Sequence, residues 1–380
     1  MALLIDKHAK YFQLCLHSLP LKAQTEDSNK LALIYFSLHG LSLMGKLEKS
    51  SETPEHIQYI YEHMIPLKDD TIQAFRPSQT FALAPENNEY DLPNLSATFF
   101  ALVIFLVLEE DFLKKIDRHK IMAFVSQCQL KAGPHAGSFL PVLGPQGTTF
   151  GESDLRLCYI AASIRKILGY DKLSVAERQN DIDVESMRRF ILDKVNFNGG
   201  LASYSHTESH SGLTFCGIAA LKLIGHEFLH HDSWTQLTVE WLVHRQVDFP
   251  ADLYKEEYDF YCEGDTGGFN GRENKFGDTC YSWWVMALLL LIDKSHIQLI
   301  DERKACDYLL QETQHKLMGG FGKDAQAFPD PFHSFLALAS LTLVKDSFVD
   351  LQIEGFESLD KIDPELVITN KSRMFMETLW

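Results

Sequence analysis

A repeated glycine pair constrains the fold of this chain more than any other feature of its sequence. Three such pairs are each followed by Leu or Phe: Gly199-Gly200, Gly267-Gly268 and Gly319-Gly320. A polar residue lies ten positions after the second glycine of each pair: His210, Asp278 and Asp330. A long apolar segment follows each polar residue, so equivalent positions recur in one repeating unit.

Apolar periodicity predicts helices in much of the remaining chain. Two earlier segments, 94–108 and 154–169, repeat the apolar half of the unit, and amphipathic stretches such as 184–195 and 302–311 lie between such segments. Sustained alternation of apolar and polar residues, which is typical of strands, is missing. The chain is therefore predicted to be all-α.

Helix pairs of this kind predict a ring. The nearly all-apolar members would pack against one another on the inside, and the amphipathic members would surround them. We expect an α/α toroid, a double ring of about six helical hairpin repeats, that forms a single domain over residues 1–380. The loops at equivalent repeat positions would then meet at one end of the ring.

Charge and composition exclude several function classes. The formal net charge of −17 would repel a nucleic-acid backbone, so no nucleic-acid partner is expected. The longest apolar run, 97–108, is too short to cross a bilayer, and the first residues lack the pattern of a secretory signal. The seven cysteines are scattered, mostly in apolar runs, as in proteins with reduced thiols. We expect a cytoplasmic protein that is not integral to a membrane.

One set of residues has the chemistry of a metal site. Asp278 and Cys280 place a carboxylate and a thiol two positions apart at a predicted helix start, and a toroid would bring His333 near them. Oxygen, sulfur and nitrogen donors that leave a fourth position open suit catalytic zinc. On spacing alone, an alternative remains, in which Asp278 caps a helix, Cys280 is a small core residue and His333 is an interior histidine.

A second set has the chemistry of a diphosphate site. Five cationic or potentially cationic residues fall in repeat-related loops or helix starts: Arg156, His210, Arg272, Lys275 and Lys323. Their convergence at one ring mouth would suit a diphosphate, although each could instead be solvated or paired with an acidic residue. Aromatic residues of the apolar helices could pack as core or line an apolar tunnel: Phe99, Phe100, Tyr159, Phe215, Tyr281, Trp283 and Trp284.

Three stretches resemble those of protein prenyltransferase beta subunits: GFNGRENKFGDTCYSWW, ESHSGLTFCGIAAL and DPFHSFLALASL. The likeness runs from about Lys7 to the C-terminal segment and implies the same α/α toroid. It implies that Asp278, Cys280 and His333 bind one zinc ion, and that Lys323, His210 and Tyr281 are catalytic. It also implies the residues that bind the isoprenoid diphosphate: His210, Ser211, Gly212, Arg272, Glu273, Asn274, Lys275, Tyr281, Ser282, Trp283, Trp284, Arg156 and Tyr159.

Local features distinguish the three branches of this family. The farnesyl and type II branches carry a magnesium-binding aspartate where this chain has Lys323, whose ammonium could neutralise the leaving diphosphate without magnesium. Ala32 falls where the farnesyl branch has a tryptophan, which leaves room for a twenty-carbon lipid. The N-terminal stretch and KIDPELVITNKSR also resemble type I subunits, whereas YSWWVMALLLL and DPFHS are closer to type II.

The resemblance therefore implies a beta subunit of protein geranylgeranyltransferase type I. Such a subunit works with a helical-repeat alpha subunit that is shared with farnesyltransferase. It transfers geranylgeranyl from geranylgeranyl diphosphate to proteins with a C-terminal Cys-aliphatic-aliphatic-Leu motif, such as Rho-type small GTPases, with no magnesium. The alternatives are a farnesyl or type II beta subunit, or a zinc-free toroid that only binds. A terpene cyclase is disfavoured, because the stretch that comes nearest to its Asp-x-Asp-Asp pattern, DIDVE at Asp181, does not match it.

Overall fold

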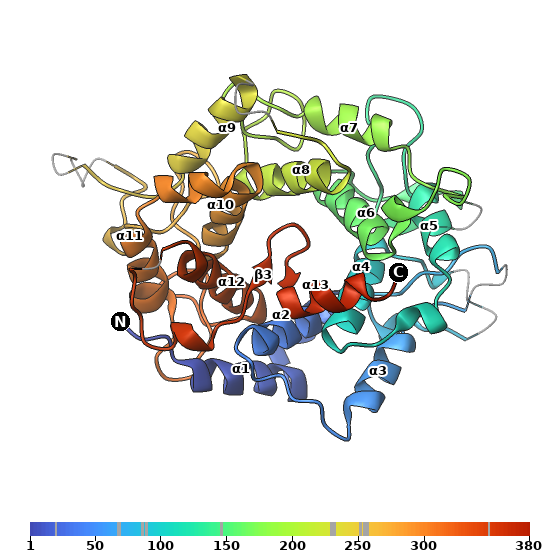
Figure 1. Ribbon diagram of the computed structural model, residues 1–380, viewed down its shortest axis with the longest axis horizontal. Coiled ribbons are helices and arrows are strands. Elements are labelled where there is room, and N and C mark those ends of the chain that lie inside the picture. The colour runs from blue at the N-terminus through green and yellow to red at the C-terminus, as the bar shows by residue number, and fades with distance from the viewer. Residues whose placement is uncertain are drawn as a thin grey trace.

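Two concentric rings of helices make up the computed structural model (Figure 1), which describes residues 1–19, 21–66, 70–84, 87, 90–144, 147–228, 233–250, 253, 258–348 and 350–380. The inner helices are α2 (Lys30–Leu43), α4 (Leu95–Val107), α6 (Leu155–Ile167), α8 (Ser211–Leu223), α10 (Thr279–Ile292) and α12 (Pro331–Ser347). Each packs on the next, and α12 packs on α2, which closes the ring. The predicted all-α toroid is confirmed.

The outer ring alternates with the inner one along the chain. Its helices are α1 (Ile5–His17), α3 (Thr53–Tyr61), α5 (Arg118–Gln127), α7 (Val184–Leu192), α9 (Ser233–Val243) and α11 (Glu302–Asp307). A π-helical turn, Tyr308–Thr313, continues α11. Short 3₁₀ turns occur at Leu21–Asn29, Gln79–Phe81, Phe112–Lys114, Tyr170–Lys172, Glu263–Asp265, Lys294–Leu299 and Phe356–Ser358. The inner helices are thus mostly buried, while the amphipathic outer ones face solvent on one side.

The polar residues of the repeat begin the inner helices. The side chain of each accepts a hydrogen bond from a backbone N–H of the first turn, which satisfies a donor that the helix itself leaves unpaired. These N-cap residues are Asn94, Asp154, His210, Asp278 and Asp330. Because the caps are equivalent, the loops that carry them lie at the same end of the ring.

The first glycine of each pair allows the outer helix to approach the loop. Gly267 has a φ of +86°, and a Cβ atom there would lie 2.2 Å from the backbone oxygen of Lys304 on α11. The equivalent glycines Gly199 and Gly319 make the same kind of contact. So does Gly137, where a Cβ would lie 2.1 Å from the backbone oxygen of Ser186 on α7. A further unit is therefore present at Gly137-Ser138-Phe139, where serine replaces the second glycine of the pair.

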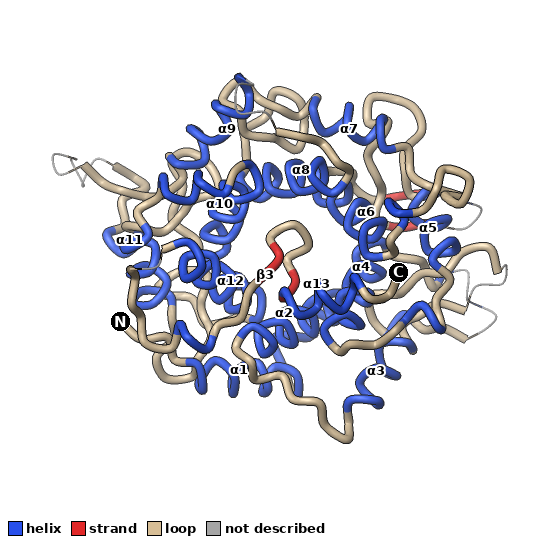
Figure 2. Tube along the Cα trace, in the orientation of Figure 1, coloured by secondary structure: helices blue, strands red, loops and turns tan. Residues whose placement is uncertain are grey.

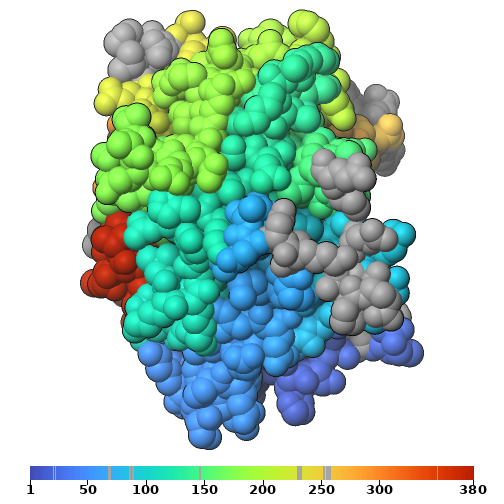
Figure 3. Space-filling view, turned by 90° about the vertical axis from the view of Figure 1, so that its right-hand side faces the viewer, coloured from blue at the N-terminus to red at the C-terminus, as the bar shows by residue number. Residues whose placement is uncertain are grey.

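The C-terminal segment enters the centre of the ring. Strands β3 (Ile362–Asp363) and β4 (Ile368–Thr369) form an antiparallel hairpin, and α13 (Asn370–Glu377) packs on α4. Figure 2 shows this hairpin inside the inner ring, and from the side (Figure 3) the red C-terminal residues reach the surface at one end of the ring axis. A second small hairpin pairs β1 (Val142–Leu143) with β2 (Thr149–Phe150).

No helix in the described parts of the chain combines the length and the apolar character needed to span a bilayer.

Candidate active site

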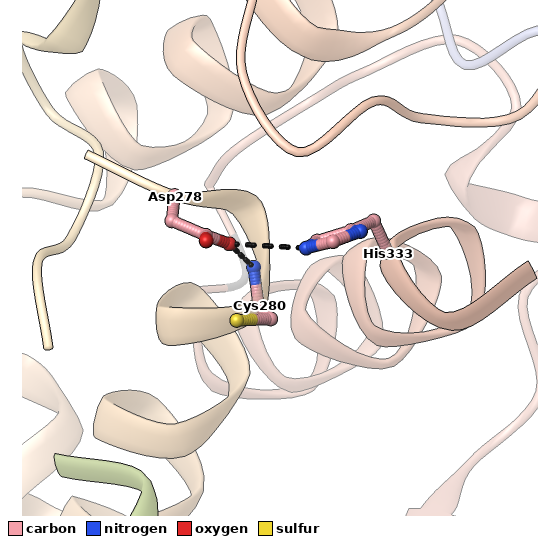
Figure 4. Close-up of side chains that lie close together, drawn as sticks. All are labelled: Asp278, Cys280 and His333. Atoms are coloured by element: carbon pink, nitrogen blue, oxygen red, sulfur yellow. Dashed lines mark hydrogen bonds and ion pairs between the residues drawn. The ribbon is translucent and has the colours of Figure 1, made fainter. Parts of the chain in front are cut away.

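Three donor side chains from two inner helices meet at the capped end of the ring. Asp278 caps α10, and its Oδ1 accepts a hydrogen bond of 2.9 Å from the backbone N–H of Cys280 in the first turn. His333 lies in the first turn of α12, with its Nε2 3.3 Å from Asp278 Oδ1. The three possible ligand atoms all lie within 4.8 Å of one another (Figure 4). The N-cap interpretation of Asp278 is thus correct, and it is compatible with a metal site.

Asp330 fixes the orientation of His333. Its Oδ1 accepts the backbone N–H of His333 at 2.9 Å, and its Oδ2 lies 2.6 Å from the ring Nδ1. A proton on Nδ1 donated to this carboxylate leaves the Nε2 lone pair directed at Asp278 and Cys280. A histidine ligand held by a carboxylate in this way is typical of metal centres. One carboxylate oxygen, one thiol and one imidazole nitrogen fit a divalent metal such as zinc.

The charges in this cluster depend on one another. Burial opposes ionisation of Asp278, but the hydrogen bond and charge of His333 and the hydrogen bonds from Cys280 together outweigh it and lower the pKa of the carboxyl group. Burial and the neighbouring Asp278 raise the pKa of the Cys280 thiol well above its ordinary value. Burial disfavours the imidazolium of His333, yet Asp278 and Asp330 together raise its pKa to about 9. A bound cation would displace the protons of the thiol and of Nε2, so its binding would release protons.

A polar cleft lies beside the cluster. It has a volume of about 470 Å³, and its lining includes Asp278, Arg272, Lys275, Tyr281 and Lys323. The Nζ of Lys323 lies 4.0 Å from Asp278 Oδ2. Three of the cationic side chains predicted to converge are therefore in one cleft, next to the candidate metal-binding cluster of Asp278, Cys280 and His333.

His210 and Tyr281 lie at one side of this cleft and hydrogen-bond to each other. The Nδ1 of His210 accepts the backbone N–H of Gly212 at 3.1 Å and of Leu213 at 3.3 Å, so a neutral ring carries its proton on Nε2. That nitrogen lies 3.1 Å from the hydroxyl oxygen of Tyr281. Burial and the nearby Arg272 lower the pKa of His210, which favours this neutral form. The hydroxyl proton of Tyr281 is then available to another acceptor.

An apolar cavity continues from His210 into the ring. Its volume is about 610 Å³, within the range of ligand pockets. Its lining includes four more residues of the predicted lipid and diphosphate set: Arg156, Tyr159, Gly212 and Trp284. Arg156 pairs with Asp154, and Tyr159 packs edge-on against Phe99. The site thus joins a candidate metal-binding cluster, a cationic cleft and an apolar cavity.

Comparison with known proteins agrees with this architecture. The model of the prenyltransferase alpha-alpha toroid domain matches residues 3–368 of the chain. The chain belongs to the prenyltransferase toroid family. The beta subunit of geranylgeranyl transferase type-1 from Arabidopsis thaliana is 29% identical to this prenyltransferase over 358 residues, which are 90% of this chain and 85% of that one. The same subunit from Dictyostelium discoideum is 31% identical over 358 residues, 89% of this chain and 90% of that one.

A solved structure is similar over the whole prenyltransferase chain. It is described as Candida albicans protein geranylgeranyltransferase-I complexed with GGPP, and it is 44% identical, with a TM-score of 0.90. The match covers 100% of this chain and 99% of that chain. The predicted likeness to type I subunits is confirmed by these relatives.

Other predicted residues of the prenyltransferase site lie outside the cleft and the cavity. Ser211, Ser282 and Trp283 are fully buried in the packing of the inner helices. Glu273 accepts a hydrogen bond of 2.5 Å from the indole N–H of Trp241. Their part in lipid or diphosphate binding stays a prediction.

Two further predicted residues lie at the periphery. Asn274 is exposed, and its side-chain oxygen accepts a hydrogen bond of 3.3 Å from the hydroxyl of Tyr258. Ala32 is half-buried on α2, one turn before the cavity residue Phe36, and is not among the described residues that line the cavity. Its role as a lipid-length gate also stays a prediction.

The cavity of the prenyltransferase also contains residues that the sequence did not single out. They include Phe36, Leu213, Phe332, Leu336 and Val367. Leu213 and Phe332 lie in the first turn after a repeat N-cap, so their distance from the cap was a usable indication. Val367 belongs to the C-terminal segment and carries no such indication.

Proposed function

We propose that this chain is the catalytic beta subunit of a protein geranylgeranyltransferase type I. It would transfer geranylgeranyl from geranylgeranyl diphosphate to the cysteine thiol of proteins that end in Cys-aliphatic-aliphatic-Leu. One observation carries the proposal: the hydrogen-bonded pair His210 and Tyr281 lies where the apolar cavity meets the cationic cleft, beside Asp278 of the metal-binding cluster. The named type-1 relatives support the same activity.

Asp278, Cys280 and His333 would hold zinc. Bound there, zinc would lower the pKa of the substrate thiol, so that a thiolate is present near neutral pH. Asp330 would keep the His333 ring aligned through its bond to Nδ1. Three protein donors would leave the fourth coordination position free for the substrate sulfur, as in catalytic zinc sites.

The reaction exchanges one bond at the first carbon of the lipid. The substrate thiol gives up its proton to solvent, and its sulfur forms a bond to that carbon. The bond between the carbon and the diphosphate oxygen breaks, and the diphosphate leaves with the electron pair. The aromatic cavity would hold the isoprenoid chain extended, so that the reacting carbon lies at the cleft.

The cleft residues would stabilise the charge on the leaving diphosphate. Arg272 and Lys275 provide positive charge, and Tyr281 can donate its hydroxyl proton because His210 Nε2 already donates to its oxygen. Each preorganised donor in such a site contributes roughly 2.7–4 kcal/mol to transition-state stabilisation. Lys323 would supply the charge that magnesium supplies in other branches, so no magnesium is expected.

A complete enzyme would require a helical-repeat alpha subunit, shared with farnesyltransferase, as a partner. Rho-type small GTPases, with their C-terminal cysteine, are the expected protein substrates, and the expected location is the cytoplasm. The subunit would bind neither nucleic acid nor a membrane core.

Prenyl transfer by the chain, co-expressed with its alpha partner, tests the proposal. Peptides ending in Cys-aliphatic-aliphatic-Leu or -Ser would be offered with fifteen- or twenty-carbon diphosphate, in zinc, with and without magnesium. Twenty-carbon transfer to the Leu peptide without magnesium is the expected result. Magnesium-dependent fifteen-carbon transfer to the Ser peptide would indicate a farnesyl enzyme. Transfer to a Rab-type protein but to neither peptide would indicate a type II enzyme. A chain that transfers no lipid and binds no zinc would be a binding module.

A further inference from the structure

The floor of the apolar cavity comes from a different part of the chain than its walls. Every other described lining residue belongs to an inner helix or to the loop just before one. Val367 alone comes from the C-terminal segment, at the end of the loop that joins β3 to β4. This loop is the tip of the hairpin that Figure 2 shows at the centre of the ring.

Contacts with α2 show how far the hairpin extends along the ring axis. The backbone N–H of Asp360 bonds to the carbonyl of Leu43, the last residue of α2, at 2.7 Å. The backbone N–H of Thr369 bonds to His39 Nδ1 at 3.3 Å, and the Tyr35 hydroxyl donates to the carbonyl of Val367. These α2 positions are successive turns, so the tip lies about 12 Å from the end of the helix.

The tip therefore faces the reactive end of the site. The N-caps His210, Asp278 and Asp330 mark the end of the ring that carries the metal-binding cluster and the cationic cleft. The hairpin enters from the opposite end, where α2 finishes. A lipid with its diphosphate in the cleft would extend along the cavity toward Val367.

The tip is held rigidly. Val367 has a φ of +57°, a conformation that is strained for a β-branched residue, and its N–H donates to the carbonyl of Asp363 at 3.0 Å. The side chain of Asp363 accepts the backbone N–H groups of Glu365 and Leu366 at 2.9 and 2.8 Å. Arg373 of α13 lies 3.3 Å from the same carboxylate. Such a network keeps the tip in one place despite its strain.

The end of the chain anchors the segment a second time. The indole N–H of Trp380 donates to the carbonyl of Ile167 at 3.0 Å, and the ring covers Gly169. The ammonium group of Lys172 lies 3.9 Å from the centre of the same indole ring. The hairpin thus cannot withdraw from the cavity without breaking contacts with both α2 and the end of α6.

We propose that Val367, positioned by Tyr35 and the C-terminal hairpin, sets the longest isoprenoid that the cavity accepts. The inference rests on the proposed function, because it assumes that the cavity holds an isoprenoid. An isoprenoid is linear, so when its first carbon is fixed at the cleft, its length decides whether its far end meets the floor. A single methylene in an apolar pocket changes discrimination by about 10–200-fold.

Two substitutions at the floor test this in the complex with the alpha partner. V367L adds bulk without branching at Cβ, and we expect it to lower the ratio of kcat/KM for the twenty-carbon over the fifteen-carbon diphosphate at least tenfold. V367G removes the side chain and suits the positive φ, and we expect at least a tenfold gain for a twenty-five-carbon diphosphate relative to the twenty-carbon one. K361Q, at an exposed position just before β3 and outside the cavity lining, is the matched control and should keep both ratios.

The outcomes separate the two proposals. Ratios that stay at the wild-type value in folded V367L and V367G would overturn the role of Val367. If V367L does not fold, V367G decides, since glycine adopts this backbone conformation without strain. If wild-type complex transfers no lipid, the proposed activity fails, and competition among the three diphosphates for binding to wild type and V367G still decides the length inference. If wild type and V367G rank the three diphosphates in the same order of affinity, or if neither binds any of them, the length inference is overturned.

Discussion

The Nδ1 of His333 lies 2.6 Å from the Oδ2 of Asp330, while the other oxygen of this carboxylate caps the helix that carries the histidine. One residue therefore both starts α12 and orients His333, a candidate metal ligand. This double use brings a repeat position that only caps a helix at Asn94 into the site.

Replacing Asp330 by Asn should weaken zinc binding without unfolding α12. Asn caps helices as well as Asp does, but its neutral amide holds the imidazole less firmly. Loss of such a supporting carboxylate typically lowers metal affinity about 10–100-fold. Competition with a chromogenic chelator would measure the affinity of wild type and D330N.

D117N provides the control for this measurement. Asp117 caps the outer helix α5 by accepting the N–H of His119 at 2.8 Å, far from the cluster. This variant should bind zinc as wild type does. Equal zinc affinity in D330N and wild type would show that Asp330 does not support the metal.

Changing the charge of Lys323 should alter turnover and metal dependence. Its ammonium lines the cationic cleft 4.0 Å from Asp278, on a side chain that is half exposed. We expect K323A to lower kcat by up to about 100-fold, because a preorganised charge near the leaving group is lost. K323D should be slow as well but should accelerate when magnesium is added.

Steady-state prenyl transfer over a magnesium titration checks this prediction. K294A, at the opposite end of α10 and exposed, should behave as wild type. A K323D enzyme with unchanged, magnesium-independent turnover would remove Lys323 from the proposed mechanism.

Substitution of Gly267 should destabilise the ring beyond the usual effect of its backbone conformation. Gly225 and Gly267 have φ values of +81° and +86°, but a Cβ at Gly225 meets nothing within 4 Å, whereas one at Gly267 lies 2.2 Å from the carbonyl oxygen of Lys304. G225A should therefore lose about 1–2 kcal/mol from strain alone. G267A should lose about 1–3 kcal/mol more, because α11 must move. Denaturant unfolding of both variants separates the two effects, and equal losses would contradict the packing role.

The sequence predicted the features that are local. Inner helices and their caps recur with the repeat, so the position of Asp278 and Asp330 in the repeating unit is enough to place both at helix starts. The metal-binding cluster followed because two equivalent helix starts lie side by side in a closed ring. The unit at Gly137 was missed because Ser138 replaces the second glycine of its pair.

Orientation within a helix and long-range contacts could not be read from the sequence. Trp283 and Trp284 are adjacent, yet successive helix residues point about 100° apart, and only Trp284 is among the described cavity residues. Glu273 lies in a basic loop, but it accepts a hydrogen bond from Trp241 of the outer helix α9. Val367 meets Tyr35 across 332 positions of sequence, a separation that no local pattern encodes.

Buried His39 should make stability depend on pH. Its Nε2 lies 3.3 Å from the carbonyl of Val103, its Nδ1 accepts the N–H of Thr369, and burial lowers its pKa from 6.5 to about 3. Between these values the unfolded chain binds the proton and the folded chain does not, so the free energy of unfolding falls as the pH drops below 6.5. At pH 5 this one residue should lower the free energy of unfolding by about 2 kcal/mol relative to pH 7.

Denaturant unfolding from pH 7 to 5 tests this role of His39. H39Q should lose less stability over this range than wild type, while H244Q, at an exposed position, should follow wild type. Parallel curves for H39Q and wild type would show that His39 does not carry this dependence.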